Sequence, residues 1–180
     1  MCELVNVVGG GDLNREVRLD QLYNDLTAPT VRYNPESFSA LYVKFQDSGP
    51  AVMVFSSGKY NIAGAKSVES LKSASDFLLN NLSGLGIEIN QSDVEVEVRN
   101  RVYVDDCGFE LDLEILLPDL GFENTEYEPE IFPGIMYRPS SGGLLIIFRS
   151  GKVMVTGLSD PQRSKNTIRR VKTRISELIE

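Results

Sequence analysis

Residues 33–38 read Tyr-Asn-Pro-Glu-Ser-Phe, and residues 127–132 repeat the pattern as Tyr-Glu-Pro-Glu-Ile-Phe, 94 positions later. A second block, Phe-Ser-Ser-Gly-Lys at 55–59, returns as Phe-Arg-Ser-Gly-Lys at 148–152, 93 positions later. A period near 94 residues is too long for the unit of a solenoid. The sequence therefore predicts two similar half-domains, residues 1–90 and 91–180. We expect a pseudo-twofold axis to relate them and one sheet to run through both, so that they form one domain.

The composition excludes most enzyme chemistry. The chain contains no histidine, so the usual general base and the commonest metal ligand are both missing. Cys2 and Cys107 have no zinc-site spacing, and Tyr60 and Val153 follow the two Ser-Gly-Lys turns where a phosphate loop requires Ser or Thr. We therefore expect a protein that is not an enzyme and that holds neither a metal nor a cofactor.

The charge of the chain is unevenly distributed. The formal net charge of −8 divides into −2 for residues 1–87, −12 for residues 88–130 and +6 for residues 131–180. An acidic chain argues against a nucleic-acid ligand, but segregated charge allows one surface to attract phosphates while another repels them. The acidic residues also fit an adaptation to high salt, and the sequence leaves both interpretations open.

Apolar periodicity and turn signals predict the same order of elements in both halves. In the first half we expect a strand at 3–9, a helix at 17–26, an extended stretch at 30–45 that turns at Asn34-Pro35, strands at 51–56 and 59–65, and a helix from an N-cap at Ser67 to about residue 81. In the second half we expect a strand at 94–104, a helix at 111–117, strands near 124–138, at 144–149 and at 152–158, and a helix from near Pro161 to the C-terminus.

Strand alternation places Phe38, Ala40, Tyr42 and Lys44 on one face of the sheet. The equivalent face of the second half carries Phe132, Gly134, Met136 and Arg138. Asn100 interrupts a stripe of valines between residues 94 and 104, and its repeat mate is Asn6. If helices cover one face, the other is an exposed, largely apolar surface with cations at its edges, which predicts a binding site.

The duplicated Tyr-x-Pro-Glu-x-Phe and Phe-x-Ser-Gly-Lys blocks, with Asn-x-Val opening each half, closely resemble the TATA-box-binding protein family in its archaeal form, over about residues 3–175. The resemblance implies an α+β fold: a saddle whose curved, ten-stranded antiparallel sheet carries four helices on its convex face. It also implies a general transcription initiation factor that binds and bends promoter TATA-box DNA through the minor groove. The family is itself a standard example of such kinking, so this expectation comes from the resemblance alone.

The resemblance assigns a role to each matched position. The four phenylalanines expected to wedge between base steps are Phe38, Phe55, Phe132 and Phe148. The residues expected to contact the minor groove are Asn6, Val8, Asn100, Val102 and Thr156. Those expected near the DNA backbone are Lys44, Ser57, Lys59, Arg138, Ser150 and Lys152. The residues expected to bind transcription factor B, in the loop near 128–131, are Glu128, Glu130 and Ile131.

Several residues depart from the family pattern. The first half has Ala63 where the second has Thr156, and Asn61 where an aliphatic residue is usual. Ser39 and Ala40 replace the Pro-Gly kept at 133–134, and Arg101 and Tyr103 occupy strand positions expected to face the helices. These changes predict altered DNA binding by the first repeat and a diverged paralogue, one of several such factors in its cell.

The implied partners are double-stranded TATA-element DNA, transcription factor B directly and RNA polymerase indirectly, with no membrane, in a cytoplasmic, nucleoid-associated protein. A second hypothesis is a protein-interaction module that does not bind DNA and scaffolds or sequesters transcription factors. A third, an accessory domain of an enzyme, is disfavoured because no catalytic domain is attached. The basic C-terminal helix is either a solvated face or a docking surface for an acidic partner or flanking DNA; its cations are Arg163, Lys165, Arg169, Arg170, Lys172 and Arg174.

Overall fold

The computed structural model describes residues 1–179 and contains ten strands and four α-helices. The elements of the first half are β1 (Glu3–Asp12), α1 (Leu19–Asp25), β2 (Thr30–Asn34), β3 (Phe38–Lys44), β4 (Ala51–Phe55), β5 (Lys59–Ala65) and α2 (Val68–Gly84). Those of the second half are β6 (Glu97–Asp106), α3 (Leu113–Leu120), β7 (Thr125–Glu126), β8 (Gly134–Tyr137), β9 (Leu144–Phe148), β10 (Lys152–Leu158) and α4 (Pro161–Ile179). Short 3₁₀ turns lie at Gln91–Asp93 and Phe122–Asn124.

The strands are hydrogen-bonded in the order β2-β3-β4-β5-β1-β6-β10-β9-β8-β7. Every pair whose register is described is antiparallel. The predicted fold class of ten antiparallel strands and four helices is therefore confirmed.

Two compact units make up the chain. The N-terminal unit is Asn6–Arg99, and the C-terminal unit is Met1–Val5 with Asn100–Glu180. The C-terminal unit therefore contains the first residues of β1 and most of β6. The N-terminal unit contains the rest of β1 and the first residues of β6. The predicted boundary between the two sequence repeats lies between residues 90 and 91. It stays a prediction, because the compact units are divided after Val5 and after Arg99 and do not test it.

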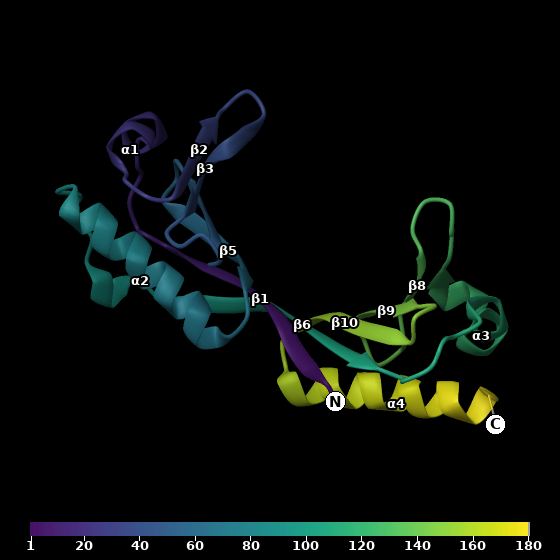
Figure 1. The fold of residues 1–180 in the computed structure, drawn as a ribbon. Coiled ribbons are helices and arrows are strands. Elements are labelled where there is room, and N and C mark those ends of the chain that lie inside the picture. Colours follow the sequence, from purple (N-terminus) through teal and green to yellow (C-terminus); the bar gives the residue numbers. More distant parts are fainter. Residues whose placement is uncertain (180) are drawn as a thin grey trace. The chain divides into compact units, whose positions relative to one another are not determined.

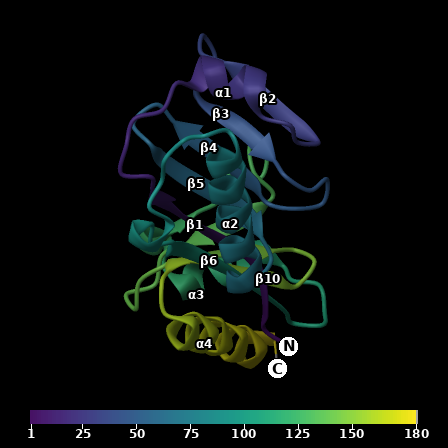
Figure 2. The ribbon, with the colours of Figure 1, turned by 90° about the vertical axis from the view of Figure 1, so that its left-hand side faces the viewer.

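Helices cover one face of the strands in each unit. In the N-terminal unit α1 contacts β2 and β3, while α2 contacts β4 and β5, which it crosses in Figure 2. In the C-terminal unit α3 contacts β8, and α4 runs along β10 (Figure 1). The side chains between these layers are fully or almost fully buried, among them Leu41, Val54, Ile62, Ile135, Ile147 and Val155.

The two long helices begin in the same way. The Ser67 hydroxyl accepts from the backbone N–H of Ser70 at 3.0 Å, as the predicted N-cap requires. At the start of α4 the Asp160 carboxylate accepts from the N–H of Arg163 at 2.8 Å, and Pro161 occupies the first helical position. Buried residues then recur on one stripe of each helix, with Leu71, Leu78 and Leu82 forming that of α2.

Some predicted boundaries were wrong. The strand expected at 94–104 begins at Glu97 and ends at Asp106; a 3₁₀ turn occupies Gln91–Asp93, and residues 94–96 belong to neither element. Helix α2 runs to Gly84 rather than about 81, and α3 begins at Leu113 after Asp112 caps it. Only Thr125–Glu126 and Gly134–Tyr137 are strands within 124–138. The C-terminal helix is described to Ile179, so its expected last residue lies outside the described residues.

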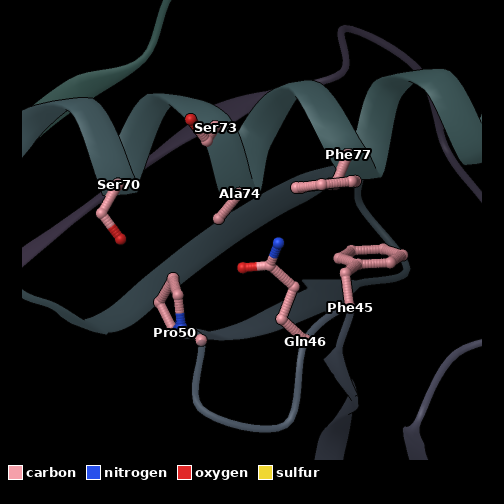
Figure 3. A pocket seen from close by; sticks show the side chains of 8 residues that line it. Phe45, Gln46, Pro50, Ser70, Ser73, Ala74 and Phe77 are labelled. Carbon is pink, nitrogen blue, oxygen red and sulfur yellow. The ribbon is translucent and has the colours of Figure 1, made fainter.

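A hollow on the helix side of the N-terminal unit lies between α2 and the loop from β3 to β4 (Figure 3). Its volume is about 220 Å³. The rings of Phe45 and Phe77 stack at one end, with centroids 6.1 Å apart and planes 16° apart. Gln46, Pro50 and hydroxyls of α2 line the rest. This contact fixes the loop to the helix, and no acidic, basic or thiol side chain lines the hollow.

Candidate nucleic-acid interface

Each unit has a strand face against which no described helix lies, and we call these the N-terminal and C-terminal open faces. The buried residues Leu41, Val43, Val52 and Val54 point toward the helices. Because side chains alternate along a strand, their neighbours Phe38, Tyr42, Met53 and Phe55 lie on the N-terminal open face. The C-terminal open face is built in the same way opposite Ile135, Leu145, Ile147, Val153 and Val155.

The structure brings the four predicted wedge phenylalanines together in two pairs. The ring centroids of Phe38 and Phe55 lie 6.3 Å apart, and those of Phe132 and Phe148 lie 5.9 Å apart. The side chain of Phe38 is 47% exposed, and the other three rings are half-buried. Aromatic pairs at this separation attract each other, yet none of the four is buried as a core residue would be. Each unit therefore presents an apolar aromatic pair to solvent at the end of its strands.

The duplicated turn after Phe55 and Phe148 explains their position. The N–H of Gly58 donates to the carbonyl of Phe55 at 2.9 Å, and the N–H of Gly151 donates to that of Phe148 at 3.0 Å. Both glycines have a positive φ, of 89° and 88°. A Cβ on Gly58 would lie 1.9 Å from the carbonyl oxygen of Arg15, and one on Gly151 would lie 2.3 Å from that of Phe109. Only glycine fits, so the turn fixes each phenylalanine at its strand end.

The asparagines predicted in the minor-groove site are both anchored through their carbonyl oxygens. Asn6 Oδ1 accepts from the N–H of Gly64 at 3.1 Å, and Asn100 Oδ1 accepts from that of Gly157 at 3.0 Å. Gly64 and Gly157 have φ of +84° and +77°, which L-residues rarely adopt. The sequence prediction missed these two glycines. They are 93 positions apart, the same offset as the second duplicated block, and this match was a signal that could have identified them.

Thr156 joins this site only in the C-terminal unit. Asn100 Nδ2 donates to Thr156 Oγ1 at 2.8 Å, so the amide is held at both ends. The N-terminal unit has Ala63 at the equivalent position, and within residues 1–179 Asn6 Nδ2 has no hydrogen-bond acceptor. Val8 and Val102 are half-buried beside the asparagines. The structure thus groups the predicted minor-groove residues of each unit.

The predicted backbone-binding residues lie at both ends of the strands, and only those of the two glycine turns are next to the phenylalanines in sequence. Ser57, Lys59, Ser150 and Lys152 are exposed in the two glycine turns, and Lys44 is half-exposed at the end of β3. Arg138 forms an exposed ion pair with Glu126 at 3.5 Å. An anionic ligand at Arg138 must therefore compete with this carboxylate.

The loop from β7 to β8 presents the predicted partner-binding residues (Figure 1). The N–H groups of Ile131 and Phe132 donate to the Glu128 carbonyl at 2.9 and 2.8 Å. Tyr127 packs against the core of the C-terminal unit. Between these anchors Glu128 and Glu130 are exposed, and Ile131 is 79% exposed. This loop therefore presents one apolar side chain between two carboxylates to solvent.

The departures Tyr103 and Arg101 lie on the helix side, as expected. Tyr103 is buried in the core of the C-terminal unit, and the Arg101 guanidinium donates to the carbonyl of Ser159. These residues therefore replace smaller ones without reaching the C-terminal open face.

Five of the six cations of α4 have partners within the C-terminal unit; Lys165 lies over the ring of Tyr103 and Arg169 donates to Asn166 Oδ1. Arg163 donates to the carbonyl of Ser141, Lys172 pairs with Asp105 at 2.9 Å, and Arg174 pairs with Asp119. Burial opposes ionisation of Asp105, but hydrogen bonds from Lys172 and the N-terminal ammonium outweigh it and lower the pKa of Asp105 to about 2. These cations therefore serve the stability of the unit.

Within residues 1–179, no cluster of three or more histidine, cysteine or acidic residues is arranged to hold a metal ion. In the same range no helix is both long and apolar enough to cross a membrane.

The chain was compared with known proteins. The profile of the family described as "Transcription factor TFIID (or TATA-binding protein, TBP)" matches residues 1–85 and 95–178. TATA-box-binding protein C of Halobacterium salinarum is 36% identical over 178 residues, covering 98% of both chains. TATA-box-binding protein of Thermoplasma volcanium is 34% identical over 174 residues, covering 96% of this chain and 93% of the relative. The solved structure of Methanococcus jannaschii TBP superimposes with a TM-score of 0.82 at 33% identity, covering 98% of both chains. The chain belongs to the TATA-box-binding protein family.

Proposed function

We propose that the protein binds and bends promoter TATA-box DNA through its open faces, as a transcription initiation factor. The observation that carries this proposal is the presence, in each unit, of a solvent-accessible phenylalanine pair and an anchored asparagine. TATA-box-binding proteins are themselves a standard example of apolar wedges that unstack base steps in the minor groove.

The energetics favour a largely apolar mode of binding. Burying one phenylalanine contributes roughly 1.5–3 kcal/mol, so two pairs offset several kcal/mol of base unstacking. Few phosphate contacts are then needed, which suits a chain with a net charge of −8. Lys59 with Ser57 and Lys152 with Ser150 would hold the backbone next to the wedges, and Lys44 would hold it at the other end of β3.

Sequence would be read mainly through deformability. Asn6 and Asn100 can donate to the acceptors that A·T and T·A pairs share in the minor groove, and Val8 and Val102 offer no polar group to the guanine amino donor. The amides therefore favour A·T over G·C, and easily kinked pyrimidine–purine steps set the position of the wedges.

The loop that carries Ile131 is the surface we propose for transcription factor B, through which RNA polymerase is recruited. The support is the 79% exposure of Ile131 between two exposed carboxylates. We also propose a nucleoid-associated protein that is one of several paralogues in its cell. Several TATA-box-binding proteins of Halobacterium salinarum are similar to it, and a source genome with a single homologous gene would contradict this part.

The test is an anisotropy titration of a TATA duplex, with and without transcription factor B, from low to molar salt. Wild type is compared with Phe132→Ala/Phe148→Ala and with Phe77→Ala, which removes a similarly exposed ring from the helix side. We expect bent-complex formation to be lost in the double variant and kept in Phe77→Ala. Absence of binding by the wild type at every salt concentration, even with transcription factor B, would overturn the proposal.

A further inference from the structure

One cation reaches the N-terminal open face from β6. The guanidinium of Arg99 donates from Nη1 to Asn61 Oδ1. Asn61 lies on β5 between Tyr60 and Ile62, both fully buried on the helix side, so its own side chain points to the open face. The exposed Arg99 side chain therefore ends on the same surface as the first phenylalanine pair.

Gly10 keeps the path of this side chain clear. It is the register partner of Asn61 in the pairing of β1 with β5. A Cβ at Gly10 would lie 3.1 Å from Arg99 Nη1 and 2.0 Å from the carbonyl oxygen of Tyr60. The glycine thus allows the guanidinium to cross β1 and reach Asn61.

The guanidinium has unused binding capacity. It carries five N–H donors, and its acceptor here is a neutral amide. Within residues 1–179 no carboxylate lies within ion-pair distance of Arg99, whereas Arg18, Arg138 and Arg174 each have one. The charge of Arg99 is therefore held in place without being neutralised by a direct partner.

The C-terminal unit has no such group. The repeat offsets relate Arg99 to Val5 and Asn61 to Met154. Val5 is exposed and Met154 is half-buried between the buried residues Val153 and Val155. Two apolar residues thus stand where the N-terminal unit has a cation and the amide that positions it.

We propose that Arg99 binds a DNA phosphate, that Asn61 positions its guanidinium, and that this contact exists in the N-terminal unit alone. The inference rests on the proposed binding of DNA by the open faces. Charge-assisted bonds from arginine to phosphate oxygens are strong and fix the register of a protein on a duplex without reading bases. On a protein built from two similar repeats, this contact makes the phosphate contacts of the two units unequal.

The first test is the salt dependence of binding to an asymmetric TATA duplex. The slope of log K against log salt is negative, and losing one phosphate contact reduces its magnitude by about 0.9. Binding at low salt weakens by about tenfold. We expect this of Arg99→Met. The matched control is Arg18→Met, which removes an exposed arginine whose guanidinium already pairs with Asp20 at 2.9 Å, and we expect its slope to stay unchanged.

A second readout separates a phosphate contact from a structural role. Phosphates of the duplex are replaced one at a time by uncharged methylphosphonates. One phosphate should weaken wild-type binding by about tenfold but leave Arg99→Met unaffected, a coupling that altered folding cannot produce. Asn61→Ala should keep the salt slope, because the charge remains, while binding weakens about threefold as the guanidinium loses its anchor.

The gain-of-function variant Val5→Arg/Val104→Gly/Met154→Asn also replaces Val104, the repeat mate of Gly10, and should increase the magnitude of the salt slope by about the amount that Arg99→Met decreases it. If wild type binds the duplex but Arg99→Met keeps the wild-type slope and couples to no phosphate, the inference is overturned while the proposed function stands. If wild type does not bind DNA at all, the proposed function fails, and this inference fails with it.

Discussion

The two open faces share a backbone but differ in side-chain chemistry. Asn6 and Asn100 accept from equivalent glycine N–H groups at 3.1 and 3.0 Å, so the duplicated frame is the same. Thr156 then holds the second amide at 2.8 Å, where the first unit has only Ala63. Gly134 pairs with Phe148 and leaves room for the ring of Phe132, whereas Ala40 pairs with Phe55. Duplication preserved the geometry, and substitution made the two faces chemically unequal.

The same contrast holds in the two cores. In the N-terminal unit the hydroxyls of Tyr60 and Ser75 are hydrogen-bonded at 2.6 Å in the core. The equivalent positions in the C-terminal unit are the buried residues Val153 and Ile168. Conversely, the Asp105–Lys172 ion pair of the C-terminal unit replaces Gly11 and Leu79. Each unit therefore has one polar pair at a place where the other unit has none.

Removing the phenylalanine pairs should have the largest effect and should rank the two faces. We expect either Phe38→Ala/Phe55→Ala or Phe132→Ala/Phe148→Ala to lower TATA affinity by on the order of 100-fold or more, because two rings lose their burial. The C-terminal double variant should lose more, since that face keeps Gly134 and Thr156. Equilibrium titration at one fixed salt concentration measures both, and a larger loss from the N-terminal pair would reverse the ranking.

Asp105→Asn should destabilise the chain by up to about 2 kcal/mol at pH 7, because the folded protein lowers the pKa of Asp105 from 3.8 to about 2. A lowered pKa contributes stability above the unfolded value, so the difference between wild type and variant should shrink as pH falls from about 4 to about 2. Urea unfolding at pH 7 and at pH 3 measures it. Asp20→Asn, which breaks the exposed pair with Arg18 in the N-terminal unit, is the control and should show a much smaller change in the same direction, because solvent screens an exposed pair. An equal difference at both pH values would contradict this assignment.

Exchanging the threonine should make the two faces more alike. Thr156→Ala removes a hydrogen bond that contributes about 1 kcal/mol, so TATA affinity should fall about fivefold. Ala63→Thr offers Asn6 the missing hydroxyl and should raise affinity by a similar or smaller factor. Competition between duplexes that differ in one half of the element shows which face responds. If Ala63→Thr has no effect while Thr156→Ala does, the first amide takes no part in binding.

Removing a helix cap should have the smallest effect. Ser67→Ala should lower the free energy of unfolding by about 1 kcal/mol, because the N–H of Ser70 loses its acceptor. Asp160→Ala should cost at least as much, since its carboxylate also interacts favourably with the positive end of the α4 dipole. Urea denaturation of both variants compares them. A clearly smaller cost for Asp160→Ala would show that the two helix starts are not equivalent.

Much of the fold and of the candidate site was predictable from local pattern. The helix start at Ser67, the turns at Gly58 and Gly151 and the phenylalanines that precede them follow from short-range rules on caps, positive φ and alternation. The strand expected at 94–104 was placed less well, because valine alternation continues through residues that the structure places before β6. Periodicity cannot locate a strand end when the residues on both sides share the pattern.

The internal repeat of the sequence by itself determined the repeated architecture and the matched positions of the phenylalanines and asparagines, because similar residues at a constant offset adopt similar local structure. Only the tertiary structure decided which long-range partners these residues have. Gly64 and Gly157 meet the asparagines across 58 and 57 positions, and Arg99 reaches Asn61 across 38. Such bonds depend on strand register and on the space that a residue such as Gly10 leaves open, and neither is a local property of the chain.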